Sequence, residues 1–126
     1  MFSVKNKVVI VTGSSGGNGS AIVKGLEKLG AIVEGGDLPS YDITIDKHRK
    51  LLVQQSLNHT GKIDGLINCA GITRGNNVFD YDDEDWENTY QVNLKAPFEL
   101  SREVARYMKN SGGSIINITS LNSELG

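Results

Sequence analysis

The sequence predicts an α/β fold, a doubly wound parallel sheet that is incomplete on its C-terminal side. Three observations lead to this prediction. Runs of apolar and β-branched residues such as "KVVIVT" and "SIINIT" lack polar alternation, which is typical of strands covered on both faces. Segments with helical spacing separate these runs, and a glycine-rich turn follows the first of them. Alternation of strand and helix predicts right-handed βαβ units around a parallel sheet.

The first third of the chain predicts two strands joined by one helix. Residues 7–12 form a continuous β-branched run and predict the first strand. After the turn "GSSGGNGS", residues 21–30 carry apolar side chains at helical spacing and end in Gly30, a suitable C-cap. The second strand is predicted over residues 31–37.

The following segment is short for an α/β unit. Residues 38–44 predict a very short connection into a short third strand, "YDIT", with no room for a full helix before it. A helix is predicted from Asp46 to about His59 with Asp46 as its cap, and we expect both His48 and His59 on the surface. Residues 63–68, "IDGLIN", predict another buried strand.

A long helical region is predicted from Asp83 to Lys109, followed by a buried strand from Ser114 to Thr119. The acidic cluster "DDED" suits the positive end of a helix, and we interpret it as a cap and not as a metal site. Pro97 predicts a kink or the first turn of a second helix. The predicted core face consists of Val92, Phe98, Val104, Ala105 and Met108.

Bulk properties narrow the class of protein. A chain of 126 residues predicts a single domain over residues 1–126. Its net charge of −2 and the lack of a basic run argue against nucleic acid as a partner. Its longest apolar run, "VVIV", is too short to cross a membrane, and the N-terminus lacks the apolar segment of a secretory signal. With a single cysteine, Cys69, the sequence favours a reducing, cytoplasmic setting.

The glycine-rich turn between the first strand and helix is a candidate phosphate site. Phosphate binding needs close backbone approach, free N–H groups and a helix N-terminus, and glycines at a βα turn permit all three. The alternative is a sharp turn between packed elements. The pattern is T-G-x-x-x-G-x-G and not the strict G-x-G-x-x-G, because Ile22 occupies the third glycine position. The predicted cofactor contacts in this turn are Gly13, Ser15, Gly17, Asn18 and Gly19.

An acidic residue at the end of the second strand strengthens this interpretation. Asp37 lies 18 residues after Gly19, close to the separation expected for a carboxylate that binds ribose hydroxyls. Such a carboxylate repels a 2′-phosphate, and no lysine or arginine lies nearby in sequence to receive one. Asp37 therefore favours NAD over NADP, with a solvated turn residue as the alternative.

Together with this turn, four further motifs resemble those of the short-chain dehydrogenase/reductase family, which has a Rossmann-type sheet. "TGSSGGNG" resembles the cofactor loop of that family, and "YDIT" resembles its pair beside the adenine, here Asp42 and Ile43. "NCAG" resembles the family's N-N-A-G strand end, which implies that Asn68, Ala70 and Gly71 also border the cofactor. The resemblance covers the whole chain, and its motifs occur in the family's order.

The other two motifs imply catalytic residues. "YQVNL" places Asn93 at the position of the family's active-site asparagine, and "GGSIINITS" resembles the strand that delivers the catalytic serine, here Ser120. A structural role for Asn93 and a loop-capping role for Ser120 remain the alternatives, and Thr119 and Ser123 are weaker candidates than Ser120. Cys69 is interpreted as a small core residue and not a nucleophile.

The resemblance implies a small carbonyl or secondary alcohol as substrate, and a homo-oligomer packed through the long helical region. The family's chemistry also needs a Y-x-x-x-K motif, and none of the four tyrosines here has a lysine four residues later. We therefore expect the N-terminal half of a longer dehydrogenase, inactive by itself. The alternative is a non-catalytic nucleotide-binding module.

Overall fold

The computed structural model describes residues 2–74 and 77–120 of the chain. Strands and helices alternate through these residues, as the sequence predicts. In chain order the elements are β1 (Val8–Thr12), α1 (Gly17–Lys28), β2 (Ile32–Gly36), α2 (Asp46–Thr60), β3 (Gly65–Asn68), α3 (Asp83–Tyr90), the π-helical turn η1 (Gln91–Lys95), α4 (Ala96–Met108) and β4 (Ser114–Asn117). None of the described helices is both long and apolar enough to cross a membrane.

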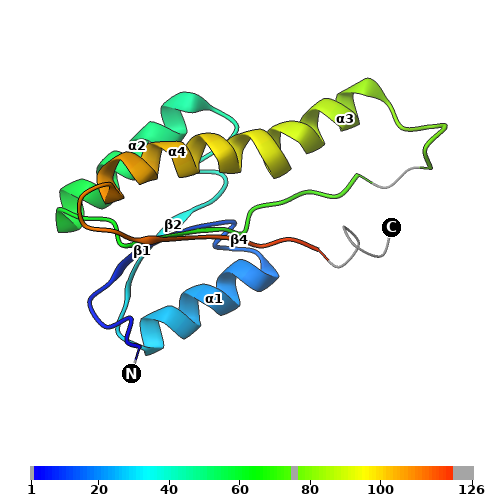
Figure 1. Ribbon diagram of the computed structural model, residues 1–126. Helices are drawn as coiled ribbons and strands as arrows, with labels where there is room; N and C mark the ends of the chain where they lie inside the picture. The colour runs from blue at the N-terminus through cyan, green and yellow to red at the C-terminus, as the bar shows by residue number, and fades with distance from the viewer. Residues whose placement is uncertain (1, 75–76, 121–126) are drawn as a thin grey trace.

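The strands form one parallel sheet in the order β2-β1-β3-β4. Helix α1 lies on one face of the sheet, whereas α2 and α4 lie on the other (Figure 1). The chain thus crosses from one face to the other between β2 and α2, and the prediction of a doubly wound parallel sheet is confirmed. Because the strands are parallel, their carboxyl ends all lie at the same end of the sheet, and ligands of such folds bind there.

Side chains on successive positions of β1 enter two separate cores. Ile10 packs with residues of α2 and α4, including Leu52 and Leu100, whereas Val9 and Val11 pack toward α1. This division follows from the two-residue period of a strand, whose side chains point alternately to the two faces. Because both faces of β1 are covered, its five residues are all buried, as the apolar run predicts.

The predicted third strand at "YDIT" is wrong, because residues 41–42 are irregular and residues 43–44 form a turn. The backbone groups of this segment bond to side chains in place of a neighbouring strand. The amide of Asp42 donates to His48 Nδ1 at 2.9 Å, and the amide of Thr44 donates to Asp42 Oδ1 at 2.9 Å. Local bonds of this kind compete with strand pairing, and here they prevail.

Helix α2 begins one residue earlier than its predicted cap implies. Ile45 occupies the N-cap position without a side-chain hydrogen bond, and Asp46 is the first helical residue. The carboxylate of Asp46 instead pairs with Lys50 at 2.8 Å, four residues along the helix. The helix ends at Thr60, and Gly61 follows with φ of 75°, a left-handed conformation that glycine adopts without strain.

The long helical region is one nearly continuous rod of α3, η1 and α4 (Figure 1). Asp82 caps α3 by accepting the Asp85 amide at 2.7 Å, which agrees with the capping interpretation of the acidic cluster. Two residues of the predicted core face, Phe98 and Ala105, are exposed. The buried positions of α4 recur at every fourth residue, Ala96, Leu100, Val104 and Met108, which confirms Val104 and Met108 of the predicted core face.

Strand β4 is exposed and not buried as the sequence predicts, and it ends at Asn117, two residues before the predicted end. It pairs with β3 and forms an edge of the sheet. Ile115 and Ile116 are 38% and 49% exposed, because Ile116 borders the open cavity beside α1 and Ile115 borders the open cavity beside α4. The apolar run identifies a strand correctly but does not show whether other elements cover it.

Candidate functional site

A cavity of about 440 Å³ lies at the carboxyl ends of β1, β2 and β3. It brings together nine of the sequence-predicted cofactor residues from four separate segments of the chain. They are Gly13, Gly17, Asn18, Gly19, Asp37, Asp42, Ile43, Ala70 and Gly71.

Two glycines of the first turn have no room for a side chain. Gly13 has φ of 63°, and a Cβ atom there would lie 2.8 Å from the Cα atom of Ala70. A Cβ atom on Gly19 would lie 1.9 Å from the carbonyl oxygen of Gly13. Nothing lies within 4 Å of the position of a Cβ atom on Gly17, so the helix start is open toward the cavity. The turn therefore has both a closely packed backbone and accessible helix N-terminal amides.

Asp37 connects the end of β2 to this turn. One oxygen of its carboxylate, Oδ2, accepts the amide of Ser15 at 2.9 Å, and Oδ1 accepts the amide of Leu38 at 2.8 Å. Ser15 itself is exposed, and its amide points to Asp37. A carboxylate that is half-buried and borders the cavity suits hydroxyl groups of a ligand as hydrogen-bond donors.

Asn68, which the resemblance places beside the cofactor, does not line this cavity but the one between α4 and β4, and its side chain joins neighbouring elements. Its Nδ2 donates to Asn117 Oδ1 on β4 at 2.9 Å and to Ser101 Oγ on α4 at 3.0 Å. Its Oδ1 is buried with no hydrogen-bond partner among the described residues. On the other side, Thr12 Oγ1 accepts the amides of Cys69 and Ala70, which joins the ends of β1 and β3.

Asn93 lies on η1 and bonds twice to the loop after β3. Its Oδ1 accepts the amide of Ile72 at 2.8 Å, and its Nδ2 donates to the carbonyl oxygen of Ile72 at 2.8 Å. Asn93 is exposed, and these two bonds pair its side-chain amide with the backbone of Ile72. Paired bonds of this kind fix the loop that contains Ala70 and Gly71 against the helical rod.

Ser120 is an exposed residue of irregular chain, three positions beyond β4. A second cavity, of about 450 Å³, lies between α4 and β4 and is lined in part by Asn68, Asn93 and Thr119. The structure thus brings the candidate asparagine and the residue before the candidate serine to one cavity. The weaker candidate Ser123 lies outside the described residues.

The predicted burial agrees with the structure for Cys69 and His59 but not for His48. Cys69 is half-buried among the apolar residues on the α1 face, and burial raises the pKa of its thiol, so the described surroundings do not favour a thiolate. His59 is exposed and lies 2.8 Å from Glu34, as expected of a surface residue. His48, expected on the surface, is half-buried because its ring turns back to the amide of Asp42.

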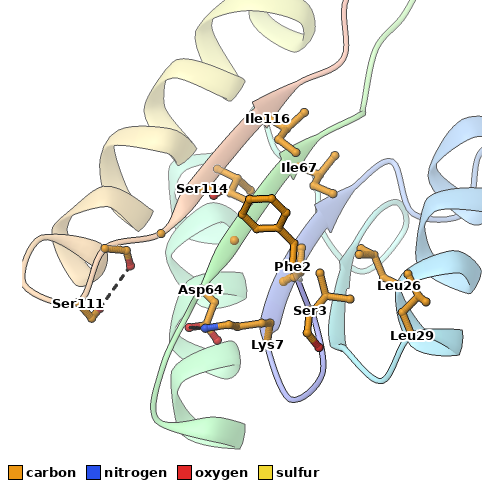
Figure 2. A pocket seen from close by; sticks show the side chains of 16 residues that line it. Phe2, Ser3, Lys7, Leu26, Leu29, Asp64, Ile67, Ser111, Ser114 and Ile116 are labelled. Carbon is orange, nitrogen blue, oxygen red and sulfur yellow. Dashed lines mark hydrogen bonds and ion pairs between the residues drawn. The ribbon is translucent and has the colours of Figure 1, made fainter.

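A larger cavity, of about 550 Å³, opens at the other end of the sheet and contains none of the predicted site residues. Figure 2 shows its apolar lining, with Leu26 and Leu29 on one side and Ile67 and Ile116 on the other. Its polar groups include the ion pair of Lys7 with Asp64, which are partners already. This cavity is larger than the one at the carboxyl ends of the strands, but the predicted cofactor residues line the latter.

The sequence did not predict seven residues that line the 440 Å³ cavity: Gly16, Gly36, Leu38, Tyr41, Cys69, Ile72 and Val92. Gly36 could have been found from its place directly before Asp37. It also has a packing reason, because a Cβ atom there would lie 2.5 Å from Leu52 Cδ2. Tyr41 and Val92 gave no sequence signal, because only the folded backbone brings them beside the glycine turn.

Comparisons with known proteins agree with this geometry. A family model described as short chain dehydrogenase matches residues 37–126. The uncharacterized oxidoreductase YgcW of Escherichia coli K12 is 36% identical and is matched over 99% of this chain and 56% of its own length. The 3-oxoacyl-[acyl-carrier-protein] reductase FabG of Haemophilus influenzae is 34% identical, over 98% of this chain and 59% of its own.

A solved structure gives the same result. A short-chain dehydrogenase/reductase from Serratia marcescens superimposes with a TM-score of 0.89 and 32% identity, over 98% of this chain and 62% of that one. The chain therefore spans a little more than half the length of the curated relatives that it matches here.

Proposed function

This chain belongs to the short-chain dehydrogenase/reductase family, and from that premise we propose that residues 1–126 form the dinucleotide-binding domain of an NAD(H)-dependent oxidoreductase. The observation that carries the proposal is the position of Asp37. Its carboxylate ends β2, borders the 440 Å³ cavity and contacts the glycine turn at 2.9 Å. The carboxylate and the N-terminal amides of α1 thus border one space, as a ribose and a pyrophosphate require.

The residues of the site fit a dinucleotide. The positions of Gly13 and Gly19 exclude side chains, which keeps the backbone accessible to phosphate oxygens. Asp37 would accept the two ribose hydroxyls and would repel a 2′-phosphate, so NAD is preferred over NADP. Asp42 and Ile43 would border the adenine, and Ala70 and Gly71 are small enough for close passage of the other ribose.

Bound NAD(H) would supply or accept the hydride in a reaction that interconverts a carbonyl and a secondary alcohol. Ser120 is proposed to donate a hydrogen bond to the substrate oxygen, which becomes more negative when a carbonyl is reduced. Asn93 is proposed to hold the loop after β3 in position through its two bonds to Ile72. The substrate class is a small carbonyl compound, consistent with the 3-oxoacyl reductase among the relatives.

We also propose a homo-oligomer in the cytoplasm, packed through the helical rod. A groove along α3 and η1 is lined by Trp86, Tyr90 and Leu94, of which Trp86 is 68% exposed. A second copy would bury such a surface. The substitution Trp86→Glu should then reduce the mass measured by light scattering for the full-length protein. An unchanged mass would exclude Trp86 from the contact.

The test of the cofactor proposal is a titration of the full-length protein with NADH and, in parallel, with NADPH. Asp37→Ala should weaken NADH binding by roughly tenfold or more, because hydrogen bonds to a charged group are lost, and should reduce the preference over NADPH. Asp83→Ala, on α3, is the matched control and should bind as the unmodified protein does. Equal affinities of the Asp37→Ala variant and the unmodified protein for both cofactors would remove Asp37 from the site.

Measurements of turnover distinguish the proposed oxidoreductase from the alternative, a nucleotide-binding protein without catalysis. Oxidation of NADH by a panel of small ketones and 3-oxoacyl thioesters should reveal activity in the full-length protein. Ser120→Ala should then lower turnover by roughly a hundredfold while NADH binding stays nearly the same. Binding of NADH without turnover of any compound would favour the non-catalytic alternative, and turnover within a few-fold would reduce Ser120 to a loop hydroxyl.

A further inference from the structure

Two side chains of α2 hold the wall of the 440 Å³ cavity next to Asp37. Nδ1 of His48 accepts the amide of Asp42 at 2.9 Å, and Nη1 of Arg49 donates to the carbonyl oxygen of Ile43 at 2.7 Å. Asp42 and Ile43 line the cavity, whereas His48 and Arg49 do not. The two α2 residues therefore act on the cavity from behind its wall.

A third contact from the same helix continues this arrangement. Tyr41, which also lines the cavity, donates its hydroxyl to Gln55 Oε1, two turns further along α2. Three consecutive wall residues, 41–43, are thus each held by a different side chain of one helix.

This wall depends on α2 because it has no regular structure of its own. Residues 37–45 include neither a strand nor a helix. Two backbone hydrogen bonds within the segment, from Tyr41 to Asp37 and from Ile45 to Asp42, make turns but do not attach it to the sheet. Besides the Asp37 bond to the Ser15 amide, the segment is attached to α2 by His48, Arg49 and Gln55. Arg49 is 7% exposed and also pairs with Asp46.

We propose that His48 is a positioning residue of the nucleotide site, which fixes Asp42 and the cavity wall through its bond to the Asp42 amide. This inference rests on the proposed function. The bond requires Nδ1 without a proton, because an amide N–H can donate only to a lone pair. The imidazole therefore carries its proton on Nε2 in this arrangement. His48 does not contact the ligand in this proposal, and it acts by reducing the freedom that the wall would otherwise lose on binding.

The chemistry of the bond suggests a precise set of variants. In asparagine, Oδ1 stands at the same distance along the side chain as Nδ1 of histidine, so His48→Asn keeps an acceptor for the Asp42 amide. His48→Gln moves the acceptor one atom further out, and His48→Ala removes it. His59→Ala is the matched control, because His59 is on the same helix and contacts Glu34 at the other end.

The experiment measures the dissociation constant of NADH for the full-length protein and these variants. His48→Ala and His48→Gln should bind NADH roughly three- to tenfold more weakly, the effect of one hydrogen bond. His48→Asn and His59→Ala should bind within about twofold of the unmodified protein. If His48→Ala unfolds, the comparison of Asn with Gln at this position decides the same question.

Two results would overturn the proposal. One is NADH binding by His48→Ala and His48→Gln that matches the unmodified protein, and the other is His48→Asn binding as weakly as His48→Gln, which would indicate a merely structural residue. In both cases the unmodified protein still binds NADH, so the proposed function stands. If the unmodified protein fails to bind NADH, the proposed function fails and this inference fails with it.

Discussion

At the amino end of the sheet the carboxylate of Asp64 accepts the amide of Val8 at 2.8 Å and pairs with Lys62 at 2.9 Å and with Lys7 at 3.9 Å. At the carboxyl end the carboxylate of Asp37 accepts two amides, and no ion pair to it exists among residues 2–74 and 77–120. Both aspartates lie next to a cavity.

The difference separates a structural carboxylate from a ligand-binding one. Asp64 has the cations and donors that it needs within its own chain, so a ligand would gain little from it. Asp37 stands among glycines and helix amides whose remaining partners must come from outside. A substitution at the amino end of the sheet should therefore change the free energy of unfolding without changing nucleotide affinity. A substitution at the carboxyl end should change nucleotide affinity.

Among the substitutions at the carboxyl end of the sheet, Gly19→Ala should have the largest effect on NADH binding. A Cβ atom 1.9 Å from the Gly13 carbonyl oxygen forces the turn to move, which should cost about 1–3 kcal/mol in stability and weaken NADH binding by more than roughly tenfold. NADH titration and urea unfolding measure the two effects. Native-like affinity in this variant would mean that the turn does not contact the cofactor.

Asp64→Ala should lower the free energy of unfolding by about 1–2 kcal/mol, because the Val8 amide and two lysines lose their partner. NADH affinity should stay within about twofold. Asp64→Asn keeps an acceptor for the Val8 amide and should lose less. A large loss of affinity in Asp64→Ala, with stability preserved, would contradict the contrast between the two ends.

The contribution of Asp64 should also depend on pH. Partial burial acts to raise the pKa of this carboxyl, but the bonds from Val8 and Lys62 outweigh burial and hold the pKa below its ordinary value. The folded state therefore binds fewer protons than the unfolded state, and the stabilisation is present above the ordinary pKa of about 3.9 and lost as pH falls through the lower folded value.

Unfolding of the unmodified protein and of Asp64→Ala, compared between about pH 6 and pH 3, measures this loss. The stability difference between them should be largest at the upper end of that range and shrink below about pH 4. A difference that stays constant, or grows toward acid pH, would show that Asp64 contributes through packing and not through its charge.

Gly25→Ala, within α1, should have the smallest effect and should sharpen the result at Gly19. Nothing lies within 4 Å of the added Cβ, so the helix should gain about 0.5–1 kcal/mol from the lower entropy of alanine in the unfolded chain. Thermal unfolding measures the gain, and NADH affinity should not change. A destabilised Gly25→Ala variant would mean that α1 does not tolerate an added methyl group. The effect of Gly19→Ala could then no longer be assigned to the glycine turn.

Much of this fold was predictable because its strands are strong local patterns. The runs at β1 and β3 are apolar except for Thr12 and Asn68 at their ends, and a short apolar run between turns is typical of a buried strand. The predicted strand at residues 41–44 failed because aspartate and threonine supplied local hydrogen bonds that a propensity argument does not count. Phe98 was misplaced for a different reason, since it lies between the buried positions Ala96 and Leu100 on α4 and faces away from them.

The candidate site divides in a similar way. Asp37 and the glycines could be found from sequence, because a positive φ at Gly13 and a carboxylate at a strand end are properties of single positions. The role of Asn93 in holding Ile72 could not, because the two are 21 residues apart and meet through the π-turn. The burial of the His48 side chain could not be found from sequence either, because the orientation of its ring depends on how α2 packs against the preceding turn.

By itself, the sequence determined β1, β2, β3 and the helices between them, the glycine turn and the acidic residue after β2, because these depend on interactions among near neighbours. Only the tertiary structure decided that α2 supports the cavity wall. It also decided that Asn68 joins β3 to both β4 and α4. Burial and long-range hydrogen bonds arise from which elements pack together, and that information is not local to any one segment.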